Sequence, residues 1–282
     1  MISDLRGSAN AFYRFSRRHP CPICGRPKWC SRTPDGCAVI CMSVQSDRKT
    51  RNGGWLHPIA DPKPFADKPL RAHAKRSPGE VVAINRRAVA SISPDLYDTL
   101  AHSLGVGVIP LEALHVGWFD RPTLRRLHAG GNGWRESYPD GAFSFPERDA
   151  DGKMIGIALR ALDGRKGCIS KARRGLTFVP ELLRRSTGLV FVVEGASDTA
   201  VGLQIGINVV GRPSNSGGGA MLTALLDGRR VIVVGENDRK PDGRWPGRDG
   251  AESVARELCL AGIDATVMMP PSAAKDLREW LK

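Results

Sequence analysis

The last third of the chain alternates between short apolar runs and amphipathic segments. Four runs rich in valine, isoleucine and leucine have the length of buried strands, at 189–193, 207–210, 231–234 and 265–268. Each is followed by a helix-like segment, and these lie at 197–205, 220–226, 249–260 and 275–282. Strands that alternate with helices predict a parallel sheet with helices on both faces. We therefore expect residues 186–282 to form an α/β domain with a Rossmann-like parallel sheet.

The pattern in residues 81–185 changes part-way. Residues 81–130 are predicted to be mostly helical, and Pro94 is placed to start a helix. From residue 131 the glycine-rich sequence breaks this pattern, and apolar and polar positions then alternate between turn signals at 149–152 and 163–164. The sequence therefore predicts a mixed α+β subdomain that begins with helices and continues as a β-hairpin.

The first 59 residues have the pattern of a small module. Two short strands are expected at 29–32 and 37–41, joined by a turn over 33–36. Residues 60–80 contain four prolines, many charges and little apolar periodicity, which predicts an exposed linker. The expected organisation is thus a module over 1–59, a linker over 60–80, a subdomain over 81–185 and a domain over 186–282.

Charge is unevenly distributed over the 282 residues, which carry a formal net charge of +13. Residues 1–60 carry ten basic and three acidic side chains, whereas residues 186–282 carry 11 basic and 12 acidic ones. Such a positive field favours nucleic acid as a partner, because phosphate binding releases counterions. No apolar run reaches the roughly 18 residues that span a bilayer, and the first residues lack the apolar core of a secretory signal. We expect a cytoplasmic protein without a membrane partner.

The first module contains a dense cluster of cysteines. Of the seven cysteines in the chain, five lie within 21 residues: Cys21, Cys24, Cys30, Cys37 and Cys41. In a reducing compartment such a cluster is typical of a metal site rather than of a disulfide scaffold. The first two form a C-P-I-C-G knuckle, whose thiolates are close enough to share one tetrahedral Zn²⁺.

The remaining zinc ligands depend on strand geometry. If Thr33 faces Gly36 across the turn, then Cys30 faces Val39, and the three cysteines of the two strands point the same way. The knuckle and two of these three would complete a zinc ribbon. His57 in the G-G-W-L-H segment is a further candidate ligand.

This module resembles the N-terminal zinc-binding module of phage- and plasmid-type DNA primases. The resemblance rests on C-P-I-C-G, K-W-C, D-G and V-I-C, followed by G-G-W-L-H-P-I. It implies that the zinc ligands are Cys21, Cys24, Cys30 and Cys41. Cys37 is then an additional thiol.

Acidic residues follow the predicted parallel strands of the last domain. Glu194 comes directly after the first strand, and Glu236 and Asp238 come just after the third. Two adjacent parallel strands would bring these three carboxylates to one edge of the sheet, where oxygen ligands suit Mg²⁺ or Mn²⁺. Asp276, after the fourth strand, is a candidate for the same edge, although it and Asp198 fit ordinary helix caps equally well.

The acidic arrangement resembles the toprim domain, which primases share with type IA and type II topoisomerases and some nucleases. The shared features are an E-G pair after the first strand and an acidic-x-acidic pair after a later one. The resemblance implies that Glu194, Glu236 and Asp238 are catalytic and bind the divalent ion. The chain departs from the family pattern because its pair is E-x-D rather than D-x-D, and glutamate reaches one methylene further.

Basic and aromatic side chains supply candidate contacts to nucleic acid. Glycines interrupt the basic stretch 164–176, so its backbone could approach phosphates closely. The surrounding segments resemble the nucleotide-handling part of the primase core, which implies that basic residues hold template and triphosphate: Arg160, Lys166, Lys171, Arg173 and Arg174. Trp29 and Trp55 of the first module are available for base stacking.

These features together predict a primase-like enzyme that makes short RNA primers on single-stranded DNA from ribonucleoside triphosphates. A structural Zn²⁺ and a catalytic Mg²⁺ or Mn²⁺ are the expected cofactors. A toprim nuclease and a non-catalytic single-stranded-DNA-binding accessory protein with a degenerate toprim site are the alternatives. The sequence contains no G-K-[ST] phosphate loop, so any helicase partner is expected to be a separate protein.

Overall fold

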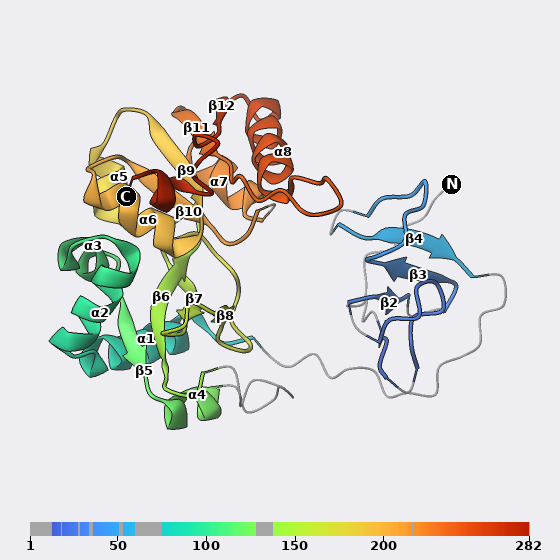
Figure 1. Cartoon of the computed structure of the whole chain (residues 1–282), viewed down its shortest axis with the longest axis horizontal. Helices are drawn as coiled ribbons and strands as arrows, with labels where there is room; N and C mark the ends of the chain where they lie inside the picture. The colour runs from blue at the N-terminus through green and yellow to red at the C-terminus, as the bar shows by residue number, and fades with distance from the viewer. Residues whose placement is uncertain are drawn as a thin grey trace. The chain divides into compact units, whose positions relative to one another are not determined.

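The computed structural model describes residues 13–17, 19–27, 29–33, 36–50, 53–59, 75–127, 138–215 and 217–281. The chain divides into two compact units, Met1–Ala74 and Lys75–Lys282 (Figure 1). The predicted linker lies mostly outside the described residues, as does the predicted glycine-rich break at 130–133. None of the helices in the described part of the chain is long and apolar enough to cross a bilayer.

The N-terminal unit is built on a small antiparallel sheet. Its strands are β1 (Tyr13–Arg14), β2 (Ser31–Arg32), β3 (Ala38–Cys41) and β4 (Trp55–Pro58), in the order β1-β2-β3-β4. The predicted turn is present, since the Gly36 amide donates to the Thr33 carbonyl oxygen at 2.9 Å. The predicted register is wrong, because Arg32 rather than Cys30 lies opposite Val39.

The register differs because the connection between β2 and β3 is wider than a four-residue turn. The Thr33 hydroxyl bonds both the amide and the carbonyl of Ala38, and the Arg32 guanidinium donates to the Gly36 carbonyl. The loop is therefore two residues longer than the sequence prediction assumed. These contacts place Cys30 beside Cys41, with the two sulfurs 3.8 Å apart.

The first part of the second unit is helical, as predicted, with one short strand among the helices. The elements are α1 (Pro78–Ser91), α2 (Pro94–Leu104), α3 (Val108–Ala113), β5 (Gly117–Phe119) and α4 (Arg121–Leu127). The expected helix start at Pro94 is confirmed, with the Ser93 hydroxyl accepting from the Leu96 amide as an N-cap. β5 is a correction to the helical prediction. Three residues are too few to show the alternating pattern of a strand, and β5 forms through its pairing with β6.

An antiparallel sheet follows, in agreement with the predicted hairpin. Its order is β5-β6-β7-β8, where β6 is Ala142–Arg148, β7 is Met154–Arg160 and β8 is Lys166–Cys168. The short helix α5 (Pro180–Arg185) leads to the last part of the chain. Between β8 and α5, Thr177 pairs with Gly211 of the next sheet, so the two sheets are joined by backbone hydrogen bonds.

The last part of the chain has the alternating architecture that its sequence predicts. The strands are β9 (Val190–Glu194), β10 (Val209–Arg212), β11 (Arg230–Val234) and β12 (Asp264–Met268), all parallel in the order β10-β9-β11-β12. The helices between and after them are α6 (Gly195–Gln204), α7 (Gly219–Leu225), α8 (Pro246–Leu260) and α9 (Leu277–Trp280). The predicted class is confirmed: a multidomain α/β protein with a Cys-rich N-terminal module, a mixed middle part and a C-terminal parallel sheet.

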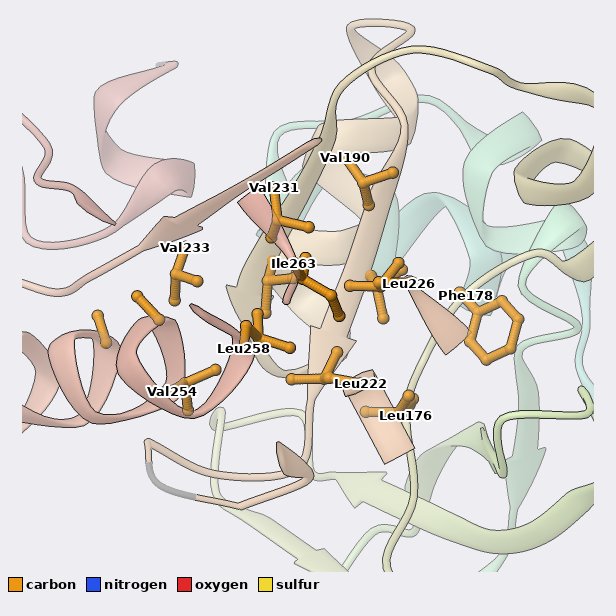
Figure 2. Packing of buried hydrophobic residues seen from close by; sticks show 14 of the residues in the cluster. Leu176, Phe178, Val190, Leu222, Leu226, Val231, Val233, Val254, Leu258 and Ile263 are labelled. Carbon is orange, nitrogen blue, oxygen red and sulfur yellow. The ribbon is translucent and has the colours of Figure 1, made fainter. Parts of the chain in front are cut away.

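Alternate residues of the strands bury opposite faces of the parallel sheet. Val190 and Val192 of β9 pack with Leu222 and with residues of α8 on one face. Figure 2 shows Val190 and Leu222 in this cluster, with Val254 and Leu258 of α8. Val193 points to the other face, where it packs with Val201 of α6 and with α9. Because both faces are covered by helices, the edge at the carboxyl ends of the strands remains the place where polar groups can gather.

The packing of this core predicts that alanine substitutions at two leucines of the domain have different effects on stability. Leu222 is fully buried against the sheet, whereas Leu260 at the end of α8 is 84% exposed. Leu222→Ala should lower the free energy of unfolding by about 2–5 kcal/mol, because it removes buried methyl groups and leaves a cavity. Urea unfolding of the full chain measures this effect. The matched Leu260→Ala variant should change stability by less than about 0.5 kcal/mol, and equal losses in the two variants would contradict this packing.

Candidate metal centres and nucleotide cleft

Four cysteines of the N-terminal unit converge on one point. The sulfurs of Cys21, Cys24, Cys30 and Cys41 all lie within 4.8 Å of one another. The first two belong to a tight turn, in which the Gly25 amide donates to the Cys21 carbonyl at 2.8 Å. Cys30 directly precedes β2, and Cys41 is the last residue of β3. The structure thus brings together the four residues that the primase resemblance implies.

The surroundings of these sulfurs suit thiolates that share a cation. The amide of Met42 points at the Cys30 sulfur, and the amides of Ser43 and Val44 point at the Cys41 sulfur, at 3.3–3.5 Å. Burial raises the pKa of Cys30 to about 12, so this thiol holds its proton at neutral pH unless a cation replaces it. Four sulfur donors at this spacing fit a tetrahedral Zn²⁺.

The other candidates in this unit lie apart from the four sulfurs. Cys37 is exposed and does not belong to the group. The His57 ring contacts the Val44 carbonyl oxygen at 3.0 Å and is also outside the group. Trp29 is 76% exposed and Trp55 is half-buried beside Cys41 in the β3–β4 ladder.

A second group of possible ligands lies at the carboxyl edge of the parallel sheet. Oxygens of Asp198, Glu236 and Asp276 all lie within 4.8 Å of one another. Asp198 is in the first turn of α6, Glu236 follows β11, and Asp276 is the N-cap of α9. Three carboxylates at this separation match the oxygen-rich sites that hold Mg²⁺ or Mn²⁺.

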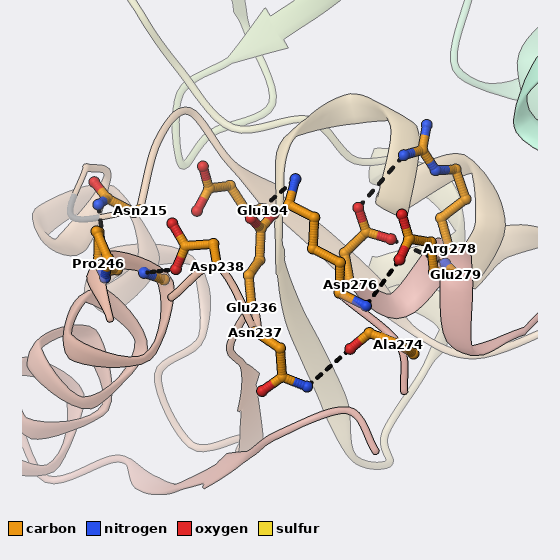
Figure 3. Close-up of polar contacts among 12 residues, drawn as sticks. Glu194, Asn215, Glu236, Asn237, Asp238, Pro246, Ala274, Asp276, Arg278 and Glu279 are labelled. Carbon is orange, nitrogen blue, oxygen red and sulfur yellow. Dashed lines mark hydrogen bonds and ion pairs between the residues drawn. The ribbon is translucent and has the colours of Figure 1, made fainter. Parts of the chain in front are cut away.

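Backbone contacts explain why Asp276 meets Glu236. The Asn237 side-chain amide donates to the carbonyls of Pro270 and Pro271 at 3.0 Å and to that of Ala274 at 2.8 Å. Figure 3 shows the bond to Ala274. The Asn237 backbone amide also donates to the Lys275 carbonyl at 2.7 Å. The loop after β12 is thereby tied to the loop after β11.

The other two predicted acids lie next to this group rather than in it. Glu194 ends β9 and its carboxylate is 3.9 Å from the Arg212 guanidinium. Asp238 accepts from the Gly247 amide at 2.7 Å and pairs with Lys240 at 3.2 Å. In the view of Figure 3, Glu194 and Asp238 lie on one side of Glu236, and Asp276 lies on the other.

Two glycines permit this arrangement of the acids. Gly195 has φ +81°, a conformation that favours glycine, so the chain can turn directly from Glu194 into α6. Gly247 lies so close to Asp238 that a Cβ would come within 2.9 Å of its carboxylate oxygen. The absence of a side chain at 247 therefore lets the amide reach Asp238.

Burial and like charge raise the proton affinity of the central acids. Desolvation, with the charges of Asp276 and Glu236, raises the pKa of Asp198 to about 8. Desolvation and the neighbouring Glu194 charge also raise the pKa of Glu236. Lys275 is 3.8 Å from Glu236, and Lys166 favours the charged forms of Asp198 and Glu236. A divalent cation would favour all three carboxylates in the same way, so the donor set fits Mg²⁺ or Mn²⁺.

A cleft of about 180 Å³ lies between the antiparallel sheet and the parallel one, and Glu194 and Ser197 are among its lining residues. Of the predicted basic residues, Arg160, Lys166 and Arg174 line it. Lys171 and Arg173 are exposed and are not among its lining residues. The structure thus separates the basic stretch into a part that faces the cleft and a part that does not.

The cleft also contains two residues that sequence reasoning did not single out. Glu147 is buried and accepts hydrogen bonds from Arg174 on both carboxylate oxygens at 2.9 Å. Arg212 is fully buried at the end of β10. Arg174 in turn donates to the Pro213 carbonyl, so it links β6 to the segment after β10.

Asp198 and Asp276 did carry a signal in the sequence. Asp198 follows Glu194 by four residues, so an E-G-x-x-D spacing places it one helical turn further along the same edge. Asp276 caps α9 through the Glu279 amide at 2.9 Å and joins the acidic group with the same carboxylate. Aspartate is common both at helix caps and among metal ligands, so the sequence pattern alone did not decide between these two roles.

Solved structures with a similar arrangement of elements include DNA primases. The chain aligns with the zinc-binding and RNA polymerase domains of the Aquifex aeolicus primase at 15% identity, over 98% of this chain and 76% of that one, with a TM-score of 0.55. It aligns with the E. coli primase catalytic core at 19% identity, over 72% of this chain and 75% of that one, with a TM-score of 0.53. The chain has the fold of the DnaG-type primases.

A third structure with the primase fold is a DnaG catalytic domain bound to single-stranded DNA, at 19% identity over 71% of this chain and 72% of that one, with a TM-score of 0.53. No protein-family model and no curated protein sequence matches the chain. The likeness to primases therefore lies in the fold. The expected combination of a zinc-ribbon-like module, a middle subdomain and a toprim-type parallel sheet is confirmed at that level.

The four-cysteine group predicts one bound zinc ion per chain. Cys24→Ser and Cys41→Ser should each lose most of this zinc, because a tetrahedral site with three sulfurs binds it far more weakly. Elemental analysis of the purified full chain measures the zinc content. Cys37→Ser is the matched control, since it removes a thiol from the same unit but outside the group. Loss of zinc in the Cys37 variant alone would contradict the assignment.

The raised pKa of Asp198 predicts how stability depends on pH without a divalent ion. The folded chain keeps this proton up to about pH 8, whereas the unfolded chain releases it near its ordinary value of 3.8. Over that window the folded state binds more protons, so the free energy of unfolding should fall as pH rises. Asp198→Asn should remove this contribution and raise stability at pH 8 by up to about 5 kcal/mol.

Thermal unfolding of the full chain between pH 5 and 8, without added Mg²⁺ or Mn²⁺, tests this expectation. Asp151→Asn is the control, because the Asp151 side chain is 73% exposed. If Asp198→Asn and Asp151→Asn share one pH profile, Asp198 is not a destabilised buried acid.

Proposed function

We propose that the protein is a DNA primase, which joins ribonucleotides on a single-stranded DNA template by metal-dependent nucleotidyl transfer. The observation that carries this proposal is the grouping of the Asp198, Glu236 and Asp276 carboxylates close to basic side chains of the cleft. Lys166 lies within electrostatic reach of Asp198, and Arg160 within reach of Asp198 and Asp276. This group lies within a fold that the chain shares with DNA primases. A divalent ion held there would neutralise phosphate charge and stabilise the charge that develops as the new bond forms.

The basic residues of the cleft suit the binding of phosphates. Lys166 is exposed and lies close enough to the acids to affect their proton affinity. Arg174 is held by Glu147 through one edge of its guanidinium, which fixes its orientation. Arg160 contacts the Ser197 hydroxyl at 3.5 Å. We assign these three side chains to the incoming triphosphate and the template backbone.

The N-terminal unit supplies the features of a template-binding module. A Zn²⁺ on the four cysteines would hold together a unit whose core is otherwise small. Trp29 offers an exposed aromatic face on which a base can stack. We propose that this unit contacts single-stranded DNA. The DnaG catalytic domain that shares the fold binds single-stranded DNA in its own structure.

The proposal predicts template-dependent RNA primer synthesis by the full chain. With single-stranded DNA, ribonucleoside triphosphates and Mg²⁺ or Mn²⁺, the wild type should make short labelled products that gel electrophoresis resolves. Glu236→Gln should reduce synthesis by more than roughly 100-fold, because it removes one charge from the site that stabilises the transition state. Glu252→Gln, an exposed change on α8, should leave synthesis unchanged.

Other outcomes separate the two alternatives. Metal-dependent cleavage of DNA without incorporation of nucleotides would replace the primase proposal with that of a toprim nuclease. Binding of single-stranded DNA that is equal in the wild type and in Glu236→Gln, with no synthesis under either metal, would favour a DNA-binding accessory protein.

A further inference from the structure

A fully buried arginine lies behind the acidic edge of the parallel sheet. Arg212 ends β10 and is the direct neighbour of Glu194 in the parallel β9–β10 pair. Its exposed fraction is 0%. The Nη1 group donates to the Asn215 carbonyl, whereas Nε and Nη2 make no hydrogen bond. Nη2 is 3.9 Å from Glu194 Oε2, and this oxygen also has no hydrogen-bond partner.

A guanidinium in such a place is costly unless carboxylates compensate it. Removing an ion from water costs several kcal/mol after relaxation, and nearby opposite charge recovers part of that cost. Burial lowers the pKa of Arg212, and the charges of Glu194 and Glu236 raise it. Arginine stays protonated in proteins. Arg212 is therefore a permanent positive charge beside these two acids.

Arg212 is also held in place by a chain of contacts that leads to α8. Asn215, which receives its Nη1, donates through its side-chain amide to the Pro246 carbonyl at 3.3 Å (Figure 3). The next residue, Gly247, donates its amide to Asp238. The two predicted acids outside the acidic group thus each have a partner from the protein itself, Arg212 for Glu194 and Gly247 with Lys240 for Asp238.

Two cations beside the acidic group are less enclosed than Arg212. Arg278 pairs with Asp276 at 3.4 Å, and its side chain is 21% exposed. Lys275 pairs with Glu236 at 3.8 Å, and its side chain is half exposed. The long, flexible side chain of a lysine can move away from its partner and extend into solvent when a metal ion binds. Arg212 is enclosed and anchored at Asn215, so it cannot leave Glu194 in the same way.

We infer that Arg212 is the resident counter-ion of Glu194, so that this edge binds a single divalent ion on Asp198, Glu236 and Asp276. Glu194 stays outside the coordination sphere, as a carboxylate that lines the cleft. Arg212 acts through Glu194 and is a positioning residue. The inference uses the metal site of the proposed function and does not depend on primer synthesis.

Electron paramagnetic resonance, which counts bound Mn²⁺, tests whether Glu194 is excluded from the metal ligands. The experiment uses the zinc-loaded full chain without DNA or nucleotides. The wild type should bind one Mn²⁺ tightly. Glu194→Gln should keep it with a dissociation constant within about threefold of the wild type, whereas Asp198→Asn should weaken it by more than roughly 100-fold, since only the second variant removes a ligand.

Substitution of Arg212 provides the second part of this experiment. Arg212→Met should acquire a second, weaker Mn²⁺, because Glu194 beside Glu236 then lacks a cation. Arg212→Lys keeps the charge and should remain at one ion. Two tight ions in the wild type, loss of the ion in Glu194→Gln, or the same second ion in both arginine variants would overturn the inference.

The Glu194→Gln arm does not require that the arginine variants fold. The result is also separable from the proposed function, because ions are counted in the absence of substrates. A wild type that binds two ions and makes primers would overturn the role of Arg212 alone. A wild type that binds one ion as described but makes no primers would overturn the primase proposal alone.

Discussion

Repulsion among carboxylates at the carboxyl edge of the parallel sheet is the constraint on which the candidate site depends. Asp198 and Asp276 are buried and Glu236 is half-buried, yet their oxygens lie within 4.8 Å of one another. Such a group is stable only when protons or cations offset its charge. The raised pKa of Asp198 reflects this balance in the absence of a metal ion.

The parallel fold is what forces the acids together. β9 and β11 are neighbours, so side chains that follow them emerge at the same edge. The loops after β11 and β12 are then joined through Asn237, which brings Asp276 to Glu236. In the N-terminal unit the four cysteine sulfurs lie equally close to one another, and a cation would hold them together as thiolates. In both places the surrounding core holds the possible ligand atoms at a distance that a metal ion can bridge.

Much of this arrangement could be predicted from the sequence because its periodicities are strong. Valine-rich runs alternating with helices specify the parallel sheet, and the position of Glu236 after such a run places it at the edge. The trio itself was not predicted in full. Asp198 and Asp276 occupy the ends of helices, where an aspartate is expected for capping alone, and only the folded loops show that they meet.

Other features of the structure differ from the sequence prediction because the local sequence is too short or too ambiguous to specify them. The β2–β3 register depends on the hydroxyl of Thr33 and the guanidinium of Arg32, which hydrogen-bond across the loop. β5 has three residues and exists through its pairing with β6. The burial of Arg212 could not be foreseen, since an arginine after a strand is ordinarily exposed.

The position of the metal ion tests the account most directly. Anomalous X-ray scattering from crystals of the chain grown with Mn²⁺ locates the ion without reference to activity. The account predicts one manganese peak enclosed by the carboxylates of Asp198, Glu236 and Asp276. A peak bound by Glu194 and Asp238 without Asp198, or no peak at this edge, would contradict it.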